Sequence, residues 1–265
     1  MVDAERLAMI DIHIHVLPGL DDGARDMAEA VEMCRLAAED GCSALVAAPH
    51  MLDGMYDVDP GEALSRLEEL RAELGRHGLK IAVESGADVH LALDLPERVR
   101  SGQAPTVAGR GLHLMVELPS DVMPEGLSET LFGLRLANVT PIISHPERNR
   151  EVQESPDCLL PLVEEGNLTQ ITAGSLLGDF GEGPERCATE LLRRHLAHFV
   201  ASDAHSAVAE RRPPGLSRAR KQVEELLSRS AAEDVFDLRP AQLIAGEAVS
   251  VPDPIAKPKK RWWFW

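Results

Sequence analysis

The segment of residues 11–23, DIHIHVLPGLDDG, gathers two histidines and two aspartates at the end of an apolar run. If its first half is a strand, His13 and His15 point to the same side, because side chains alternate faces with period two. A Pro-Gly turn then leads to Asp21 and Asp22. Two imidazoles on one face followed by paired carboxylates are typical of the start of a metal site, whereas a single histidine is more often a satisfied core residue.

Ionisable side chains also follow most of the other strands that the sequence predicts. They are His50, Asp88, His90, Glu117, His145, Asp203 and His205. In a parallel β/α barrel the carboxyl ends of all strands form one rim, and active sites are built there. So many ionisable groups would repel one another or stay unpaired without cations. The pattern therefore predicts a metal centre at that rim.

The kinds of donor atom narrow the choice of metal. Imidazoles and carboxylates without a thiolate favour divalent first-row ions, of which manganese, iron and zinc are the candidates. The set holds more ligands than one ion can use, so we expect two or three ions. Such a cluster activates water as a nucleophile and stabilises an in-line displacement at phosphorus.

Seven short apolar runs predict the strands that carry these residues. They are residues 9–14, 43–48, 80–84, 112–116, 140–144, 168–172 and 197–202. Nearly continuous apolar runs are typical of parallel strands that are buried on both faces.

Helix signals occupy the segments between the strands. Asp26 and Glu29 form a capping box, Asp59 precedes a proline at a second helix start, and further starts lie at 155–156 and 183–184. Alternating strands and helices predict an α/β fold with a parallel sheet. Seven such units favour a distorted seven-stranded (β/α) barrel, closed or nearly closed, over an open sheet, and residues 1–248 are expected to form one domain.

The composition excludes some classes of protein. The formal net charge is −17, from 27 basic and 44 acidic residues, so a general nucleic-acid binder is not expected. The chain shows neither an apolar run long enough to span a membrane nor a secretion signal, and its four cysteines lack paired spacing. These features predict a cytoplasmic protein with reduced cysteines.

At this point the sequence resembles the polymerase and histidinol phosphatase (PHP) superfamily. It is most similar to the manganese-dependent protein tyrosine phosphatases of bacterial capsule and exopolysaccharide clusters. The resemblance covers residues 9–246, and its segments include DIHIHVLPGLDDGARDM, VAAPH, PIISHPERNR, LTQITAGSLLGDFG and VASDAHSAVAERRPPGL. The combination of HPERNR with SDAHS and RRPP is specific to that branch.

The resemblance implies a role for each matching residue. The implied metal ligands are His13, His15, Asp22, His50, Asp88, Glu117, His145, Asp203 and His205. The family has a bridging glutamate where this chain has Asp88, which is one methylene shorter, and His90 is the alternative at this position. His205 also belongs to the implied catalytic group, together with Arg148 and Arg212, whose guanidinium groups suit a substrate phosphate.

The resemblance therefore implies hydrolysis of phosphotyrosine, with Mn²⁺ as the cofactor. The implied substrate is the tyrosine kinase of polysaccharide assembly, so the reaction would regulate capsular or exopolysaccharide biosynthesis. Two alternatives stay open: another PHP phosphoesterase activity, such as hydrolysis of histidinol phosphate, and a weakly active module that docks on a kinase.

Residues 187–193, CATELLR, match the C-x5-R pattern of cysteine-dependent tyrosine phosphatases. That chemistry requires a loop whose backbone N–H groups surround phosphate, and such loops are rich in small residues and glycine. Here the intervening residues are ATELL, inside a predicted helix. We interpret the match as a coincidence.

The composition changes in a C-terminal tail, residues 249–265. It ends in basic residues followed by WWFW, which holds all three tryptophans of the chain. Cations favour anionic lipid head groups and tryptophan favours the membrane interface, so a peripheral membrane contact is one interpretation. The other is that the tail covers an apolar groove of its own chain or of another copy in a homo-oligomer.

Overall fold

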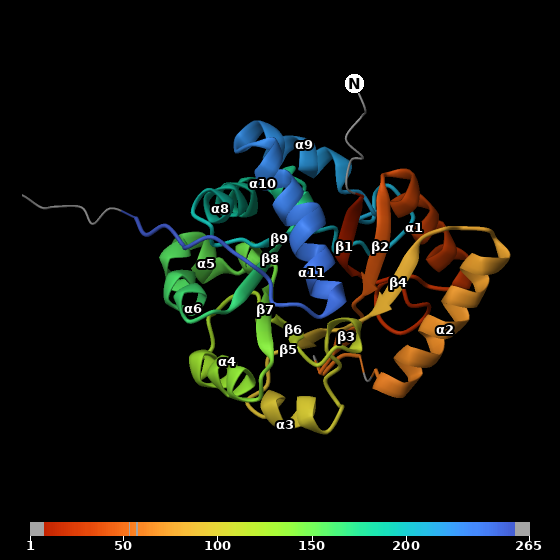
Figure 1. The fold of residues 1–265 in the computed structure, drawn as a ribbon, viewed down its shortest axis with the longest axis horizontal. Helices are drawn as coiled ribbons and strands as arrows, with labels where there is room; N and C mark the ends of the chain where they lie inside the picture. The colour runs from red at the N-terminus through yellow and green to blue at the C-terminus, as the bar shows by residue number, and fades with distance from the viewer. Residues whose placement is uncertain (1–7, 53, 57, 258–265) are drawn as a thin grey trace, which may run out of the picture.

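The computed structural model describes residues 8–52, 54–56 and 58–257, and Figure 1 shows their arrangement. Nine strands lie in these residues: β1 (Met9–Ile14), β2 (Cys42–Ala47), β3 (His50–Met51), β4 (Ala82–Ser85), β5 (Asp88–His90), β6 (His113–Glu117), β7 (Thr140–Ser144), β8 (Leu168–Thr172) and β9 (Phe199–Ala201). Every paired neighbour is parallel.

Helices surround the strands in Figure 1. They are α1 (Met27–Glu39), α2 (Pro60–Arg76), α3 (Leu95–Arg100), α4 (Leu127–Leu136), α5 (Arg150–Glu154), α6 (Leu160–Glu164), α7 (Ala173–Leu176), α8 (Glu182–Arg193), α9 (Ser217–Leu226), α10 (Arg229–Glu233) and α11 (Arg239–Ala245). Single turns join them at η1 (Val107–Gly109), η2 (Pro146–Arg148), η3 (Pro156–Leu159) and η4 (Asp234–Leu238).

The strands form two parallel sheets. One has the order β1-β2-β4, and the other has the order β3-β5-β6-β7-β8-β9. At one side the sheets meet through the backbone, because Ile14 bridges to Ala204 and the N–H of Asp203 donates to the carbonyl of His13 at 2.9 Å. The carboxyl end of β1 therefore lies beside the carboxyl end of β9.

All seven predicted strands are confirmed to within two residues at each end, but β3 and β5 are not predicted from the sequence. β3 follows β2 after two residues, and β5 follows β4 after two residues. A Cβ on Gly86 would lie 2.6 Å from Cγ1 of Val46, so the backbones come very close at the break between β4 and β5. A second short strand thus follows β2 and β4 in each case. His50 lies on the first of these short strands, β3, and Asp88 lies on the second, β5.

Two apolar clusters lie on opposite faces of the strands. In β2, Val46 belongs to an inner cluster with Met115 and Phe199, whereas Leu45 belongs to an outer cluster beneath the helices. This alternation is the period-two pattern of a strand whose two faces are both buried. The parallel α/β fold with both faces covered is as predicted.

One end of the inner cluster is covered by α11, which crosses in front of the strands in Figure 1. Leu243 of α11 is fully buried in the cluster with Ile10, Leu168 and Phe199, which are at or near the first residues of their strands. Because α11 covers the amino ends, the carboxyl ends of the strands form the end that is left for a site.

The predicted helix starts are confirmed where a cap makes them visible in the sequence. Asp26 accepts a hydrogen bond from the N–H of Glu29 at 2.9 Å, and Asp59 accepts from the N–H groups of Gly61 and Glu62. Each cap satisfies backbone donors that a helix start leaves without an internal partner. These caps fix where α1 and α2 begin.

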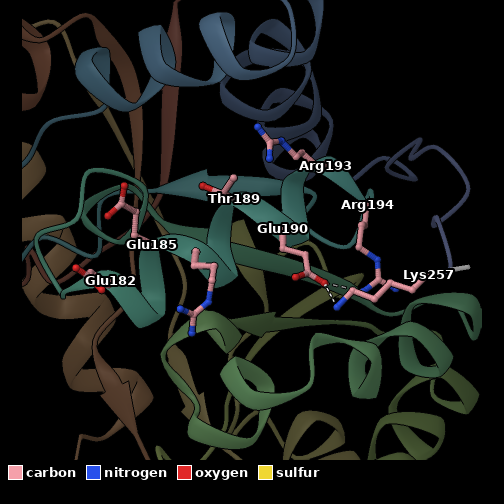
Figure 2. Close-up of a pocket in the computed structure, with 8 residues that line it drawn as sticks. Glu182, Glu185, Thr189, Glu190, Arg193, Arg194 and Lys257 are labelled. Carbon is pink, nitrogen blue, oxygen red and sulfur yellow. Dashed lines mark hydrogen bonds and ion pairs between the residues drawn. The ribbon is translucent and has the colours of Figure 1, made fainter. Parts of the chain in front are cut away.

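The described part of the C-terminal tail runs past the end of α8 (Figure 2). Ile255 and Arg194 exchange backbone and side-chain hydrogen bonds of 2.8 and 2.9 Å, and Lys257 pairs with Glu190 at 2.6 Å. The remainder, 258–265, lies outside the described residues. In the part of the chain that the structure describes, no helix is both long enough and apolar enough to span a membrane.

Candidate metal centre

The structure brings all nine predicted ligands together at the carboxyl ends of the strands. Their donor atoms form three groups within 4.8 Å: His15, Asp22, His50 and His205; His13, His145 and Asp203; and His50, Asp88 and Glu117. The residues come from, or directly follow, strands β1, β3, β5, β6, β7 and β9, with Asp22 in the loop before α1. The arrangement follows from a parallel sheet, in which all carboxyl ends point the same way.

Two histidines and an aspartate form the middle of this cluster. The Nε2 atoms of His13 and His15 are 3.2 Å apart, and Oδ1 of Asp203 lies 3.5 and 3.3 Å from them. All three side chains are buried. Donor atoms that converge at these distances inside the protein can surround a cation.

Asp88, where the resemblance leads us to expect the longer glutamate, reaches the cluster. Its Oδ2 lies 3.6 Å from His13, 3.4 Å from His145 and 3.8 Å from His50, and its Oδ1 accepts a hydrogen bond from Ser144 at 2.7 Å. Asp88 is therefore held among three imidazoles.

The alternative at this position, His90, lies further out. Its Nδ1 is 3.7 Å from Oε2 of Glu117, and the residue belongs to none of the three donor groups among the described residues. The geometry favours Asp88 over His90 as the ligand from β5.

Two residues that sequence reasoning did not assign orient the central histidines. Nδ1 of His15 donates to Oδ2 of Asp21 at 2.7 Å, and Nδ1 of His13 donates to Oε1 of Gln170 at 2.8 Å. A hydrogen bond at Nδ1 fixes the orientation of each ring, so that the Nε2 atoms of His13 and His15 face each other in the cluster at 3.2 Å. Gln170 could have been noticed as a lone amide inside the apolar run of β8.

The turn that holds Asp21 depends on a glycine. A Cβ at Gly23 would lie 2.2 Å from the carbonyl oxygen of His15, which is impossible. Oδ1 of Asp21 accepts from the N–H of Gly23 at 2.9 Å, and its Oδ2 also accepts from the N–H of His50 at 3.0 Å. The carboxylate of Asp21 thus links the segment that follows β1 to the first residue of β3.

Burial and charge shift the pKa values of the central residues in opposite directions. Burial lowers the pKa of His13 to about 4. Burial also lowers the pKa of His15, but the carboxylates of Asp21 and Asp203 outweigh it and raise the value to about 10. Burial opposes ionisation of Asp203, but a hydrogen bond from His15 and the nearby charge of His13 hold its pKa well below the usual range. The carboxylate oxygens are therefore ionised at neutral pH and available to a cation.

The residues fit a divalent metal ion. Nδ1 of His50 is buried without a hydrogen-bond partner, and its nearest carboxylate oxygens, on Glu117 and Asp88, are 3.4 and 3.8 Å away. A buried polar atom without a partner is costly, so this nitrogen is a candidate donor to a cation. The donors are imidazole nitrogens and carboxylate oxygens, the set that suits manganese, iron or zinc.

Two arginines border the cluster. Nη1 of Arg148 and Nη1 of Arg212 donate to the same atom, Oδ2 of Asp203, at 2.6 and 3.0 Å. Each side chain is 32 % exposed, so the guanidinium groups face solvent beside buried ligands. The ring of Phe180 lies 4.9 Å from Cζ of Arg148, a distance typical of a cation–π contact. Cations in this position can bind the oxygens of a phosphate.

Glu147 holds the turn that carries Arg148, and sequence reasoning did not single it out. Its carboxylate accepts hydrogen bonds from the N–H of Thr172 at 2.9 Å and from the hydroxyl of Ser175 at 2.6 Å. The side chain is fully buried, and burial raises its pKa. It ties η2 to the end of β8 and so helps to position Arg148.

Three of the candidate site residues have left-handed backbone conformations. The φ angle is 33° at His145, 51° at Asp203 and 55° at Arg212. Such conformations are uncommon outside glycine, and they cluster at functional sites because the surrounding structure must impose them.

The C-x5-R match is part of a helix, as predicted. Residues 187–193 lie in α8, and Cys187 is buried with its thiol directed to the carbonyl of Val152 at 3.7 Å. Burial raises the pKa of Cys187 to about 12. A buried thiol in a helix is not a nucleophile at neutral pH.

The fold and the cluster define a class: parallel α/β proteins similar to the barrel-like metal hydrolases. A solved structure from Escherichia coli, the phosphotriesterase homology protein, matches over 90 % of this chain and 99 % of its own with a TM-score of 0.60 and 12 % identity. At that identity the likeness concerns the fold alone.

The family follows from closer matches. The family described as "Capsular polysaccharide synthesis, CpsB/CapC" matches residues 9–245, and the chain belongs to it. A solved structure described as YwqE from Bacillus subtilis and CpsB from Streptococcus pneumoniae, "unique metal-dependent tyrosine phosphatases", matches over 95 % of this chain and 100 % of its own, with a TM-score of 0.87 and 30 % identity.

Two relatives by sequence carry related names. Tyrosine-protein phosphatase YwqE of Bacillus subtilis is 36 % identical over 198 residues, 75 % of this chain and 78 % of the relative. The putative tyrosine-protein phosphatase CapC of Staphylococcus aureus is 34 % identical over 200 residues, 75 % of this chain and 77 % of the relative.

Proposed function

We propose that this chain is a metal-dependent phosphatase that hydrolyses phosphotyrosine on a protein. The observation that carries the proposal is that nine residues with nitrogen or oxygen donor atoms lie together and that two partly exposed arginines bind one of them, Asp203. The names of its relatives support the same activity. In this proposal the ligands bind the metal ions on which the activity depends, and the arginines bind the phosphate group of the substrate.

His13, His15, Asp22, His50, Asp88, Glu117, His145, Asp203 and His205 would hold two or three ions. Mn²⁺ is the proposed metal, and iron and zinc are the alternatives that the donor set allows. When bound, the ions supply an activated water and offset charge at phosphorus. The chain favours metal binding by keeping the carboxylates ionised. It also fixes the rings of His13 and His15 through the hydrogen bonds at their Nδ1 atoms.

Arg148 and Arg212 would bind the phosphate oxygens, with His205 beside them. Both guanidinium groups already converge on one carboxylate oxygen, so they are oriented before substrate arrives. They also stabilise the charge that spreads over the equatorial oxygens during displacement. The leaving phenolate has a pKa of about 10, so it needs less protonation by a general acid than an alkoxide would.

We interpret the two sheets as one distorted seven-stranded barrel, with β2 and β3 as one interrupted strand and β4 and β5 as another. The join between β1 and the segment after β9 supports this interpretation. Residues 1–248 would then form the phosphatase domain. The interruptions bring His50 and Asp88 to the rim.

The test of this function is a comparison of substrates. The chain should hydrolyse a phosphotyrosyl peptide with Mn²⁺ and lose that activity with a chelator. Histidinol phosphate is assayed beside it, and a preference for histidinol phosphate would overturn the assignment of substrate. His145→Ala should lower metal content and rate together, whereas His77→Ala, at an exposed position on the surface, is the matched control and should change neither.

The proposed protein substrate is the phosphorylated tyrosine kinase of polysaccharide assembly, reached from the cytoplasm. The family description supports a role in capsular polysaccharide synthesis. The basic and aromatic end of the tail, 258–265, would hold the enzyme at anionic membranes, although this segment lies outside the described residues. Co-sedimentation with anionic vesicles, with and without residues 257–265, tests this, and equal binding of both forms would refute the membrane contact.

A further inference from the structure

A cavity of about 570 Å³ opens next to the candidate metal centre. Its walls come from α7, from residues 179–180, from the loop before α9 and from the first residues of α9. Arg212 lines the cavity and also donates to Asp203 of the centre at 3.0 Å. Phe180, which contacts Arg148, is a second shared residue. The cavity therefore borders the place where a phosphate would bind.

The charged side chains of the cavity differ in whether they already have hydrogen-bond or ion-pair partners within the chain. Asp40 already has partners, since its carboxylate accepts hydrogen bonds from the N–H groups of Leu216 and Ser217 at 2.6 and 2.8 Å. Three lining residues, Asp179, Glu210 and Arg218, are exposed, and their side chains have no hydrogen bond or ion pair within residues 8–52, 54–56 and 58–257. Two carboxylates and one guanidinium thus remain for a ligand.

We propose that this cavity binds the polypeptide segment next to the phosphotyrosine and prefers a basic residue there. The inference rests on the proposed phosphatase function and specifies its substrate. With the phosphate at Arg148 and Arg212, the tyrosine ring points outward and the flanking residues must lie along a neighbouring surface. The cavity is that surface on the side of Arg212.

Charge decides the preferred flanking residue. A lysine or arginine beside the phosphotyrosine meets Asp179 and Glu210. Because Arg212 is engaged by the phosphate in this proposal, these two carboxylates outnumber Arg218, the lining cation that remains. The whole chain has a formal net charge of −17 and repels an acidic phosphopeptide, so a basic flank also reduces long-range repulsion. A small aryl phosphate does not extend this far, so its hydrolysis does not depend on these carboxylates.

The experiment compares three substrates with the Mn²⁺-loaded full chain. They are phenyl phosphate, a phosphotyrosyl peptide with lysines beside the phosphotyrosine, and the same peptide with glutamates there. The variants are Asp179→Asn/Glu210→Gln in the cavity and Glu125→Gln/Glu129→Gln as the control. The control removes two exposed carboxylates before and within the first turn of α4.

The cavity variant should lower kcat/KM for the lysine peptide by about fivefold, as expected for the loss of exposed ion pairs. It should leave phenyl phosphate within about twofold of the unmodified chain, since no ion pair with that substrate is lost. The control should leave all three substrates unchanged. Glu210→Lys should invert the preference toward the glutamate peptide.

Equal losses on the peptide and on phenyl phosphate would overturn the inference, because the carboxylates would then act on the chemistry or the fold. An unmodified chain that shows no preference between the two peptides would overturn it as well. If the unmodified chain hydrolyses neither phenyl phosphate nor any phosphotyrosyl peptide, the proposed function itself fails. The two failures are therefore distinguishable.

Discussion

Asp21→Asn tests whether the hydrogen bonds behind the ligands matter as much as the ligands do. In the structure, one carboxylate receives three donors: Nδ1–H of His15 at 2.7 Å, the N–H of His50 at 3.0 Å and the N–H of Gly23 at 2.9 Å. An asparagine offers a single oxygen and an NH₂ group. Because all three partners are donors, at least one of them must face the NH₂ group and lose its bond.

The expected loss can be stated as a range. Removing a carboxylate that orients a metal-binding histidine typically weakens metal affinity tenfold to a hundredfold. At about 1.36 kcal/mol per factor of ten, this corresponds to about 1.4–2.7 kcal/mol of metal binding. The ring of His15 and the backbone of His50 are both affected, so we expect the upper half of the range.

The assay is the dissociation constant for Mn²⁺, measured by calorimetric titration, together with the thermal stability of the metal-free chain. Asp59→Asn is the matched control, because it makes the same change at a helix cap, where asparagine serves as well as aspartate. An affinity of Asp21→Asn within threefold of the unmodified chain would refute the reasoning about His15.

Three further predictions concern other parts of the molecule. Cys187→Ser should leave kcat for phosphate release unchanged, because the thiol is buried in α8 away from the centre, and a loss of activity would contradict this. Asp88→Ala should lower metal content measured by mass spectrometry, whereas Asp88→Glu should hold or raise it; full occupancy in Asp88→Ala would remove Asp88 from the site. Burial lowers the pKa of His198 to about 3. On acidification the imidazole of His198 is therefore protonated near pH 6.5 in the unfolded chain but stays neutral in the native chain. Denaturant titrations should therefore show that stability falls by about 2 kcal/mol more in the unmodified chain than in His198→Asn between pH 7.5 and 5.

The sequence predicts the rim of the fold well because two strong patterns coincide there. Apolar runs mark the buried parallel strands, and ionisable residues mark where most of these runs end. His15 and His145 could therefore be placed from their positions directly after such runs alone. The caps at Asp26 and Asp59 are local signals of the same kind, since side chain and backbone lie within three residues of each other.

The parts that the sequence does not predict depend on contacts between distant segments. The break between β4 and β5 arises where Gly86 meets Val46, and nothing near Gly86 in the sequence records that approach. The hydrogen bond from His13 to Gln170 joins residues that are 157 positions apart. Asp88 could be proposed as a ligand from resemblance, but only the fold shows that it faces three imidazoles while His90 lies further out.

The left-handed backbone at His145 and Asp203 limits which amino acids could ever replace them. Asparagine, aspartate and histidine enter this conformation several times more readily than other side chains, and β-branched residues are nearly excluded. An aspartate at residue 203 can therefore be exchanged for asparagine or histidine with little backbone strain, but less readily for glutamate, the other oxygen ligand. Laboratory evolution of this chain toward a different metal should accordingly change ligands at Asp22, Asp88 and Glu117. At residues 145 and 203 it should retain asparagine, aspartate or histidine.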